Sequence, residues 1–415
     1  MRAHLAHATI LCALVTSACG AEPAVATDTA TATAPPGDTA TSAPPDTATG
    51  DDGAADVGER DGDAAPAVAI VGARLLGAPG VADGGVAVLV LEGGVIARVG
   101  GDVPAGAEVV DLSGRFVVPA FIDSHVHLLY RPEAAEMLSG GVGGAVDMAA
   151  PVRIFDPAAV DFGALEVVAA GPMVTALGGY PTQSWGRDGY GLEVPNAEAG
   201  RAAVAKLAGL GARFIKVPFQ GEAQLSDEIA AAVIDEAHLR GLRVAVHALG
   251  DADAARAGRL GADILAHTPV EPLQPATLDL WAGKTVVSTL GAFGGADSTV
   301  ANLRALRERG ATVLYGTDFG NTTVAGVDPR ELTLLSRAGL DGAAVLAAGT
   351  TAPATFWGFA DLGALAPGKA ATFMVLRDDP RVVPSTLSSP ASVWVRGLAT
   401  GGGVGAGGSR GGRGG

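Results

Sequence analysis

Residues 117–128 read VVPAFIDSHVHL, an apolar stretch that ends in two histidines separated by one residue. Its β-branched and aromatic residues predict a buried strand. Side chains two positions apart on a strand point to the same side, so His125 and His127 can reach one ion together. This stretch therefore predicts a buried strand with a metal-binding position at its carboxyl end.

Three later stretches end in the same way. RVAVHALGD contains His247, DILAHTP contains His267, and ATVLYGTDFG contains Asp318. A single histidine at a strand end is more often structural than functional. Several such residues after successive apolar runs instead favour one shared site.

The alternation of apolar runs with helical segments predicts the fold. Glycines that can end a helix follow four of these segments, at Gly211, Gly241, Gly261 and Gly310. Ser226 is a predicted N-cap. Repeated strand–helix units give parallel strands, and about 240 residues of them match an eightfold barrel. We predict an α/β fold, a distorted (β/α)8 TIM barrel over residues 119–360, with the active face at the carboxyl ends of its strands.

Short strand-like runs between glycines flank this region on both sides. Residues 66–118 and 361–400 are therefore predicted to form one small β-sandwich domain, made from both flanks of the barrel.

The first 19 residues have the layout of an export signal: Arg2, then an apolar run, then small residues up to Cys19. The segment before Cys19 resembles a bacterial lipobox, with Thr16 where that pattern prefers leucine. We predict an exported lipoprotein of the bacterial cell envelope, lipid-anchored through Cys19 in the outer membrane or facing the periplasm. A soluble periplasmic or secreted protein is the alternative.

Two further segments have biased compositions. Residues 20–65 are rich in Ala, Thr, Pro and Asp, and they carry too little apolar surface to offset the entropy lost on ordering. We predict a disordered stalk there, and a disordered glycine-rich tail over residues 401–415.

Charge and cysteine content limit the partners and the ligands. The chain has a net charge of −16, which argues against a nucleic-acid partner, since such a partner needs a basic surface. Both cysteines, Cys12 and Cys19, lie in the predicted export signal. A metal site in the body must therefore use His, Asp, Glu or a modified Lys.

Lys216 lies between Ile215 and Val217 in a predicted strand, in a chain with only four lysines among 28 basic residues. A buried lysine loses its proton readily and becomes a nucleophilic amine, which arginine cannot do. Such an amine can take up CO2 to form a carbamate that bridges two metal ions. The alternative is a lysine that extends to solvent or pairs with an acid.

This series of residues, HxH and then Lys, His, His and Asp at strand ends 1, 4, 5, 6 and 8, resembles the amidohydrolase superfamily of metal-dependent hydrolases. Within it, the chain resembles the imidazolonepropionase-like and prolidase-like branch over about residues 66–400. GALAPGKAATFMVLRDDP is similar to the closing segment of the family. The chain departs from the family pattern at Ala120, where Gly is usual, and at Thr372, where Asp is common.

The resemblance implies a first metal ion held by His125, His127 and Asp318, and a second held by His247 and His267. It also implies that carboxylated Lys216 and a hydroxide bridge the two ions, which are expected to be zinc. The implied function is hydrolysis of amide or cyclic amide C–N bonds by attack of this hydroxide, with Asp318 as general base and acid.

Substrate specificity is expected to lie in a long glycine-rich loop. It contains the candidate substrate-binding residues Tyr180, Trp185, Arg187 and Tyr190. These residues could equally pack the barrel rim. Arg187 could meet a substrate carboxylate, Asp147 is another lining candidate, and His238 is expected on a helix surface.

The expected partner is a small molecule: an amide, a dipeptide-like compound or an acylated amino acid. An esterase or lactonase is the alternative enzyme, because an activated water attacks either kind of carbonyl. The second alternative is a non-catalytic surface lipoprotein that binds a ligand or a metal. The membrane is expected as a partner through the lipid anchor only, and a homo-oligomer is left open.

Overall fold

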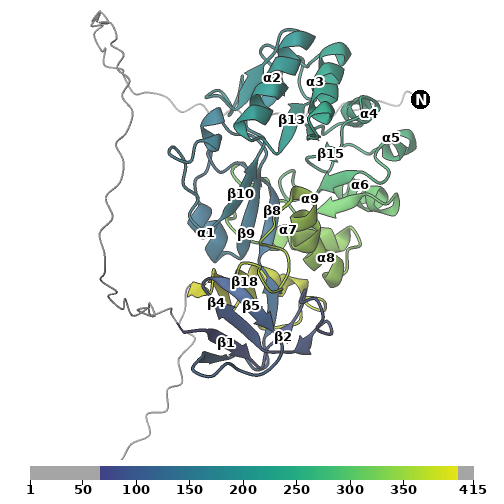
Figure 1. Cartoon of the computed structure of the whole chain (residues 1–415). Coiled ribbons are helices and arrows are strands. Elements are labelled where there is room, and N and C mark those ends of the chain that lie inside the picture. The colour runs from purple at the N-terminus through teal and green to yellow at the C-terminus, as the bar shows by residue number, and fades with distance from the viewer. Residues whose placement is uncertain (1–65, 401–415) are drawn as a thin grey trace, which may run out of the picture. The chain divides into compact units, whose positions relative to one another are not determined.

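A computed structural model describes residues 66–400 of the chain (Figure 1). The predicted export signal, Cys19, the stalk and the tail lie outside the described residues and stay predictions. Among the described helices, none is both long enough and apolar enough to cross a membrane.

Parallel strands form the centre of the described chain. The first three, β8 (Phe121–Val126), β9 (Val142–Asp147) and β10 (Glu166–Ala169), make one sheet. Next come β11 (Met173–Thr175) and β12 (Gly191–Glu193) as a pair. The remaining five form a second large sheet: β13 (Phe214–Pro218), β14 (Arg243–His247), β15 (Ile264–Leu265), β16 (Thr285–Val287) and β17 (Thr312–Leu314). All of these pairs are parallel, as the alternation of strands and helices predicted.

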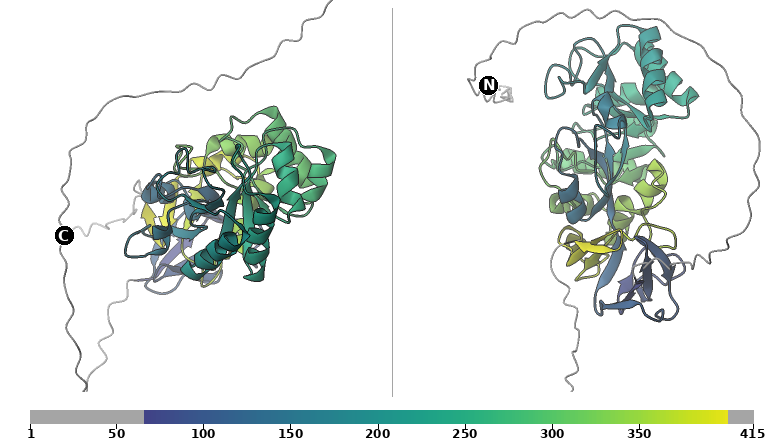
Figure 2. Two further views of the ribbon diagram at one scale, coloured as in Figure 1. Left: turned by 90° about the horizontal axis from the view of Figure 1, so that it is seen from above. Right: turned by 60° about the vertical axis from the view of Figure 1, so that its left-hand side comes forward.

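Helices follow these strands and lie along the outside of the barrel region (Figures 1 and 2). They are α1 (Ala134–Ser139), α2 (Ala197–Leu210), α3 (Asp227–Leu239), α4 (Asp251–Arg259), α5 (Pro275–Leu280), α6 (Asp297–Glu308), α7 (Pro329–Arg337), α8 (Gly342–Gly349) and α9 (Thr351–Trp357), with short 3-10 turns at Val152–Phe155 and Pro384–Ser388. Ser226 caps α3, because its side chain accepts a hydrogen bond from Ile229 N. Gly211 ends α2 with a φ of 104°, a left-handed conformation that glycine adopts without strain.

The described strands do not form one closed hydrogen-bonded ring, so the distorted (β/α)8 barrel predicted from the sequence is confirmed only as a barrel-like α/β fold. The ladder is interrupted between these three groups of strands, and in the stretch between β10 and β11 Gly171 has a φ of 74° and Pro172 has no N–H to donate. A few backbone hydrogen bonds connect the groups: Ser124 N donates to Tyr315 O at 2.9 Å, His127 N donates to Phe319 O at 2.7 Å, and Arg213 N donates to Ala169 O at 3.0 Å.

Two further sheets come from the flanks of the barrel region. One has the order β5-β4-β1-β6 and the other the order β20-β19-β18-β7-β2-β3. Their strands are β1 (Val68–Val71), β2 (Arg74–Leu75), β3 (Gly85–Val86), β4 (Leu89–Glu92), β5 (Val95–Val99), β6 (Glu108–Asp111), β7 (Phe116–Pro119), β18 (Phe373–Leu376), β19 (Ser392–Val395) and β20 (Leu398–Thr400). Ile70, Leu89 and Phe373 share one hydrophobic cluster, so both flanks contribute to one core. The description of this region as a β-sandwich domain stays a prediction.

Gly349, the last residue of α8, lies against the Phe121 ring at the base of β8, which leads to the histidine pair. A Cβ at residue 349 would overlap ring atoms of Phe121, so Gly349→Ala is expected to destabilise the protein by about 1–3 kcal/mol. Gly209 in α2 is exposed and has no atom within 4 Å of a built Cβ, so Gly209→Ala is the matched control and should stabilise by about 0.5–1 kcal/mol. Urea unfolding of both variants measures the difference, and equal stabilities would contradict the close packing at Gly349.

Candidate metal centre

The two histidines of the first barrel strand are oriented by backbone carbonyls. His125 Nδ1 lies 2.7 Å from Ala266 O, and His127 Nδ1 lies 3.2 Å from Ala149 O. A carbonyl oxygen can only accept a hydrogen bond, so each imidazole must carry its proton on Nδ1. Each Nε2 then has a free lone pair, the form in which a neutral histidine binds a metal ion.

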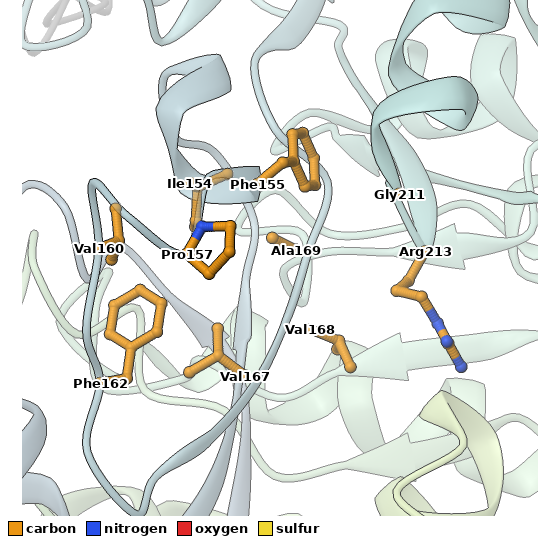
Figure 3. Close-up of a pocket in the computed structure, with 10 residues that line it drawn as sticks. All are labelled: Ile154, Phe155, Pro157, Val160, Phe162, Val167, Val168, Ala169, Gly211 and Arg213. Atoms are coloured by element: carbon orange, nitrogen blue, oxygen red, sulfur yellow. The ribbon is translucent and has the colours of Figure 1, made fainter. Parts of the chain in front are cut away.

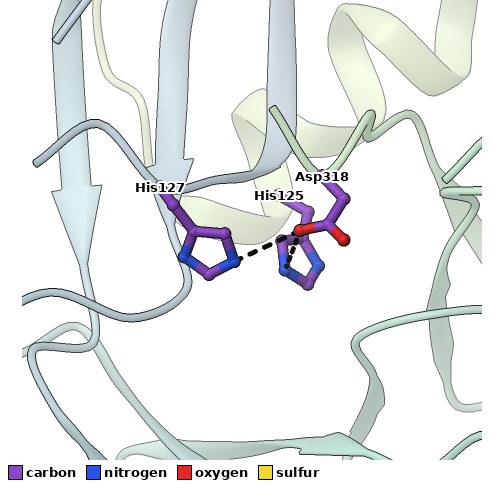
Figure 4. A group of neighbouring side chains, drawn as sticks. All are labelled: His125, His127 and Asp318. Carbon is purple, nitrogen blue, oxygen red and sulfur yellow. Dashed lines mark ion pairs between the residues drawn. The ribbon is translucent and has the colours of Figure 1, made fainter. Parts of the chain in front are cut away.

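Asp318 completes a compact cluster with these histidines. Its Oδ1 lies 3.4 Å from His125 Nε2 and 3.2 Å from His127 Nε2 (Figure 4). One ligand atom from each of the three buried residues lies within 4.8 Å of the others. These distances are short enough for one ion to contact all three atoms.

A buried carboxylate that the sequence analysis did not single out holds Asp318 in place. Asp123 accepts hydrogen bonds from Thr317 N at 3.1 Å, from Thr317 Oγ1 at 2.5 Å and from His125 N at 3.0 Å. Burial raises the pKa of Asp123 to about 7. Asp318 itself has a φ of 58°, a conformation that is uncommon outside glycine and that the bonds to the preceding residue help to maintain.

The other two predicted histidines join the same cluster. His247 is the last residue of β14, and His267 follows β15. The ring centroids of these two residues are 4.7 Å apart, and the ring of His267 lies 4.3 Å from that of His125. Burial lowers the pKa of His125, His247 and His267 well below the ordinary value, so these imidazoles are neutral.

Lys216 is fully buried in β13. Burial is the main cause that lowers the pKa of Lys216, to about 7, and the negative charge of Asp318 opposes it. Within residues 66–400, Lys216 Nζ, His125 Nε2 and His247 Nε2 have no hydrogen-bond partner. Buried polar atoms are normally paired, so three unpaired nitrogens in one cluster fit a site built to hold cations. The donor set, imidazole nitrogen and carboxylate oxygen, suits zinc.

Aromatic residues of the loop between β11 and β12 lie against this cluster. The ring centroid of Trp185 is 4.8 Å from that of His127, and Tyr180 is 5.0 Å from His247. Trp185 Nε1 donates a hydrogen bond to the Tyr180 hydroxyl at 2.8 Å, and Tyr190 packs 5.2 Å from Trp185. The loop therefore contacts one histidine of the predicted first metal site, His127, and one of the predicted second site, His247.

Arg187 is placed differently from these three aromatic residues. Its side chain is exposed, and the hydrogen bond it makes among the described residues is a long one of 3.5 Å to Gln183 O. The structure brings the aromatic candidates to the histidines but shows no such contact for Arg187 within the described chain.

Two other residues can now be placed. Asp147 is fully buried and accepts hydrogen bonds from Leu128 N at 2.8 Å and Ala149 N at 3.1 Å. It therefore holds the turn after His127, and its role as a residue lining a substrate site stays a prediction. His238 lies on α3 at the surface, as expected, with Nε2 2.8 Å from Asp263 Oδ2.

A cavity of about 350 Å³ lies elsewhere, beside β10 and the amino end of β13 (Figure 3). Most of its lining residues are apolar, among them Phe155 and Phe162, and Arg213 adds a charged side chain. It contains none of the predicted site residues. The candidate site is therefore identified from the buried histidines and not from this cavity.

Comparisons with known proteins identify a family and several related sequences. The amidohydrolase family model matches residues 116–401. An adenine deaminase of Deinococcus deserti is 30% identical over 322 residues, which are 72% of this chain and 53% of that protein. An imidazolonepropionase of Rhodococcus jostii is 41% identical over 69 residues, 16% of this chain and 17% of that protein. The chain thus spans about half the length of the curated adenine deaminases that it matches.

Solved structures show the same fold at low sequence identity. A Xaa-Pro dipeptidase with bound methionine has a TM-score of 0.69 and 20% identity, covering 81% of this chain and all of that chain. Phenylurea hydrolase B has a TM-score of 0.67 and 20% identity, covering 80% of this chain and 96% of that chain. These likenesses support the barrel-like α/β fold.

Proposed function

Because this chain belongs to the amidohydrolase family, we propose that it is a metal-dependent hydrolase of C–N bonds. The observation that carries the proposal is the group of buried donor atoms around Asp318. His125 and His127 present Nε2 lone pairs toward its carboxylate, and the nearby Lys216 Nζ and His247 Nε2 lack partners among the described residues. Such a group is costly to bury unless it binds something.

We assign His125, His127 and Asp318 to a first divalent ion, and His247 and His267 to a second. Lys216 would join the two after carboxylation: its neutral Nζ adds to the carbon of CO2, and one N–H proton leaves to solvent. The product is a carbamate whose single negative charge is shared by two oxygens, which would let Lys216 serve as a ligand to both ions. Full burial and the absence of a partner for Nζ in the described chain support this role.

Bound zinc ions would lower the pKa of a water molecule and polarise the carbon that is attacked. The protein contributes the proton transfers. Asp318 accepts the proton of the attacking water and passes it to the leaving nitrogen. Asn321 Nδ2, which donates to Asp318 Oδ1 at 3.1 Å, helps to hold the carboxylate in place for this. Tyr180 and Trp185 would cover the site and exclude bulk water.

The names of the similar proteins suggest the substrates to try. Adenine deaminase, Xaa-Pro dipeptidase and phenylurea hydrolase all refer to C–N bonds, in an exocyclic amine, a peptide and a urea. A small amide, dipeptide-like or acylated amino acid substrate is our first choice. A panel should hold dipeptides, N-acyl amino acids, adenine, phenylureas, lactones and aryl esters, the last two as tests of the esterase alternative.

We expect the full chain, purified with bicarbonate and zinc, to hold two zinc ions per chain by elemental mass spectrometry. Removal of the metal with a chelator should abolish turnover of any C–N substrate found in the panel, and added zinc should restore it. One ion per chain would contradict the bridging role of Lys216. A chain without metal would contradict the hydrolase and favour a surface binding protein.

A further inference from the structure

His267 is contacted by the loop after β16, defined here as the 289–295 loop. Thr289 Oγ1 lies 3.1 Å from His267 Nδ1, and the Phe293 ring meets the His267 ring edge-on with centroids 5.0 Å apart. The Thr289 hydroxyl oxygen can accept a hydrogen bond from Nδ1–H, which leaves Nε2 as the nitrogen available to a metal ion. The orientation of this histidine therefore depends on the position of the loop.

The backbone at Thr289 is strained. Its φ is 40°, and β-branched residues rarely adopt positive φ values. Such a conformation costs of order 1–3 kcal/mol and persists only where the surroundings enforce it. Thr289 is also fully buried, so a relaxed backbone would move its hydroxyl away from His267.

The surroundings that enforce this conformation come from α7. Glu331 is buried, and its two carboxylate oxygens accept hydrogen bonds from the two residues after Thr289: Leu290 N at 3.0 Å and Gly291 N at 2.7 Å. Arg330 adds a hydrogen bond to Gly294 O at 2.8 Å. Neighbouring residues of one helix thus fasten both ends of the 289–295 loop.

We propose that Glu331 is a positioning residue for His267: its carboxylate fixes the 289–295 loop, so that the Thr289 hydroxyl holds His267 Nδ1 and Nε2 is free for the second metal ion. This inference rests on the proposed function, because it concerns one ligand of the metal centre. Glu331 also relates the second metal site to the first. Its helix α7 follows, in the chain, the segment that carries Asp318, a ligand of the first site.

A pair of variants at Thr289 tests the hydroxyl. Thr289→Ser keeps the hydroxyl, whereas Thr289→Val keeps the branched shape without it. The purified full chain is stripped of metal and titrated with zinc in bicarbonate buffer against a chromophoric chelator. We expect Thr289→Ser to bind two zinc ions like the wild type, and Thr289→Val to bind the second about 10- to 100-fold more weakly.

Variants at Glu331 test the support of the loop. Glu331→Ala is expected to weaken the second zinc site in the same way, whereas Glu308→Gln, at an exposed residue of α6, should leave both sites unchanged. Cobalt(II) replaces zinc in a parallel titration, where the visible absorption reports the geometry around the ion. The spectrum of the second cobalt ion should change in Thr289→Val and Glu331→Ala but not in Thr289→Ser.

Thermal unfolding of the metal-free proteins separates positioning from stability alone. If Thr289→Val and Glu331→Ala bind zinc and cobalt as the wild type does, the inference is wrong, whatever their stability. If Glu331→Ala does not fold, the Thr289 pair decides the question. A wild-type chain that binds no zinc would instead overturn the proposed function, and this inference with it.

Discussion

Replacing Asp318 with asparagine is expected to lower kcat by about 10²- to 10⁴-fold while the zinc content stays near the wild-type value. Asparagine has nearly the same shape and keeps one oxygen that can face His125 and His127, as Asp318 Oδ1 does. It cannot accept and return a proton at neutral pH. The variant therefore separates proton transfer, which should be lost, from metal binding, which should remain.

The comparison needs turnover and zinc content from the same preparation. Asp297→Asn is the matched control, because the side chain of Asp297 is exposed at the start of α6. Asp318→Asn with wild-type kcat would refute the assigned base, and a variant without zinc would show that the carboxylate acts mainly as a ligand.

Lys216→Ala is expected to lose most of its bound zinc, and turnover should fall roughly 10³-fold or more, with no recovery at high bicarbonate. Carboxylated Lys216 is the one protein group proposed to contact both ions, so its loss removes a ligand from each. Lys216→Met keeps much of the side-chain volume in the buried site and should show the same loss with less disturbance of packing. In the wild type, ¹³C-bicarbonate should give the NMR signal of a carbamate carbon, which both variants lack.

Lys206→Ala provides the control, because Lys206 is exposed on α2. It should keep the zinc content, the turnover and the carbamate signal of the wild type. Full zinc occupancy in Lys216→Met would rule out the bridge and make Lys216 a structural residue.

The sequence could predict the candidate ligands because each one has a local signal. His125, His247 and Asp318 each follow a short run of apolar residues, and such a run marks a buried strand without reference to any distant contact. Parallel strands place their carboxyl ends together, so the order of these runs sufficed to bring the side chains to one face.

The residues that hold the ligands in place have no such signal. Glu331 acts on backbone N–H groups 40 and 41 positions away, and a single glutamate in an amphipathic helix predicts only a polar side chain. The sequence does not predict the left-handed backbone conformation of Thr289, because threonine normally avoids positive φ values. Asp123 could have been found, because an acid two positions before His125 in an apolar strand must lie on the same face and needs partners.

Closure of the barrel depends on features that local patterns do not report. Gly171 and Pro172 mark in the sequence a place where a strand can end. Whether the hydrogen bonding between neighbouring strands is also lost there depends on how far those strands are staggered. The short strand β15, with two residues, shows the same limit: its existence was predictable, while its hydrogen bonding was not.

The pairing of β7 with β2 on one side and β18 on the other bears on how the chain is made. During synthesis from the amino end, β7 emerges early, but its partner β18 emerges only after the entire barrel region. At about 5–20 residues per second, β7 has an unpaired edge for many seconds, and unpaired edges favour aggregation. Ribosome-bound chains that stop before residue 373 should therefore be the most dependent on chaperones, and this part of the chain should complete its folding only after β18 has emerged.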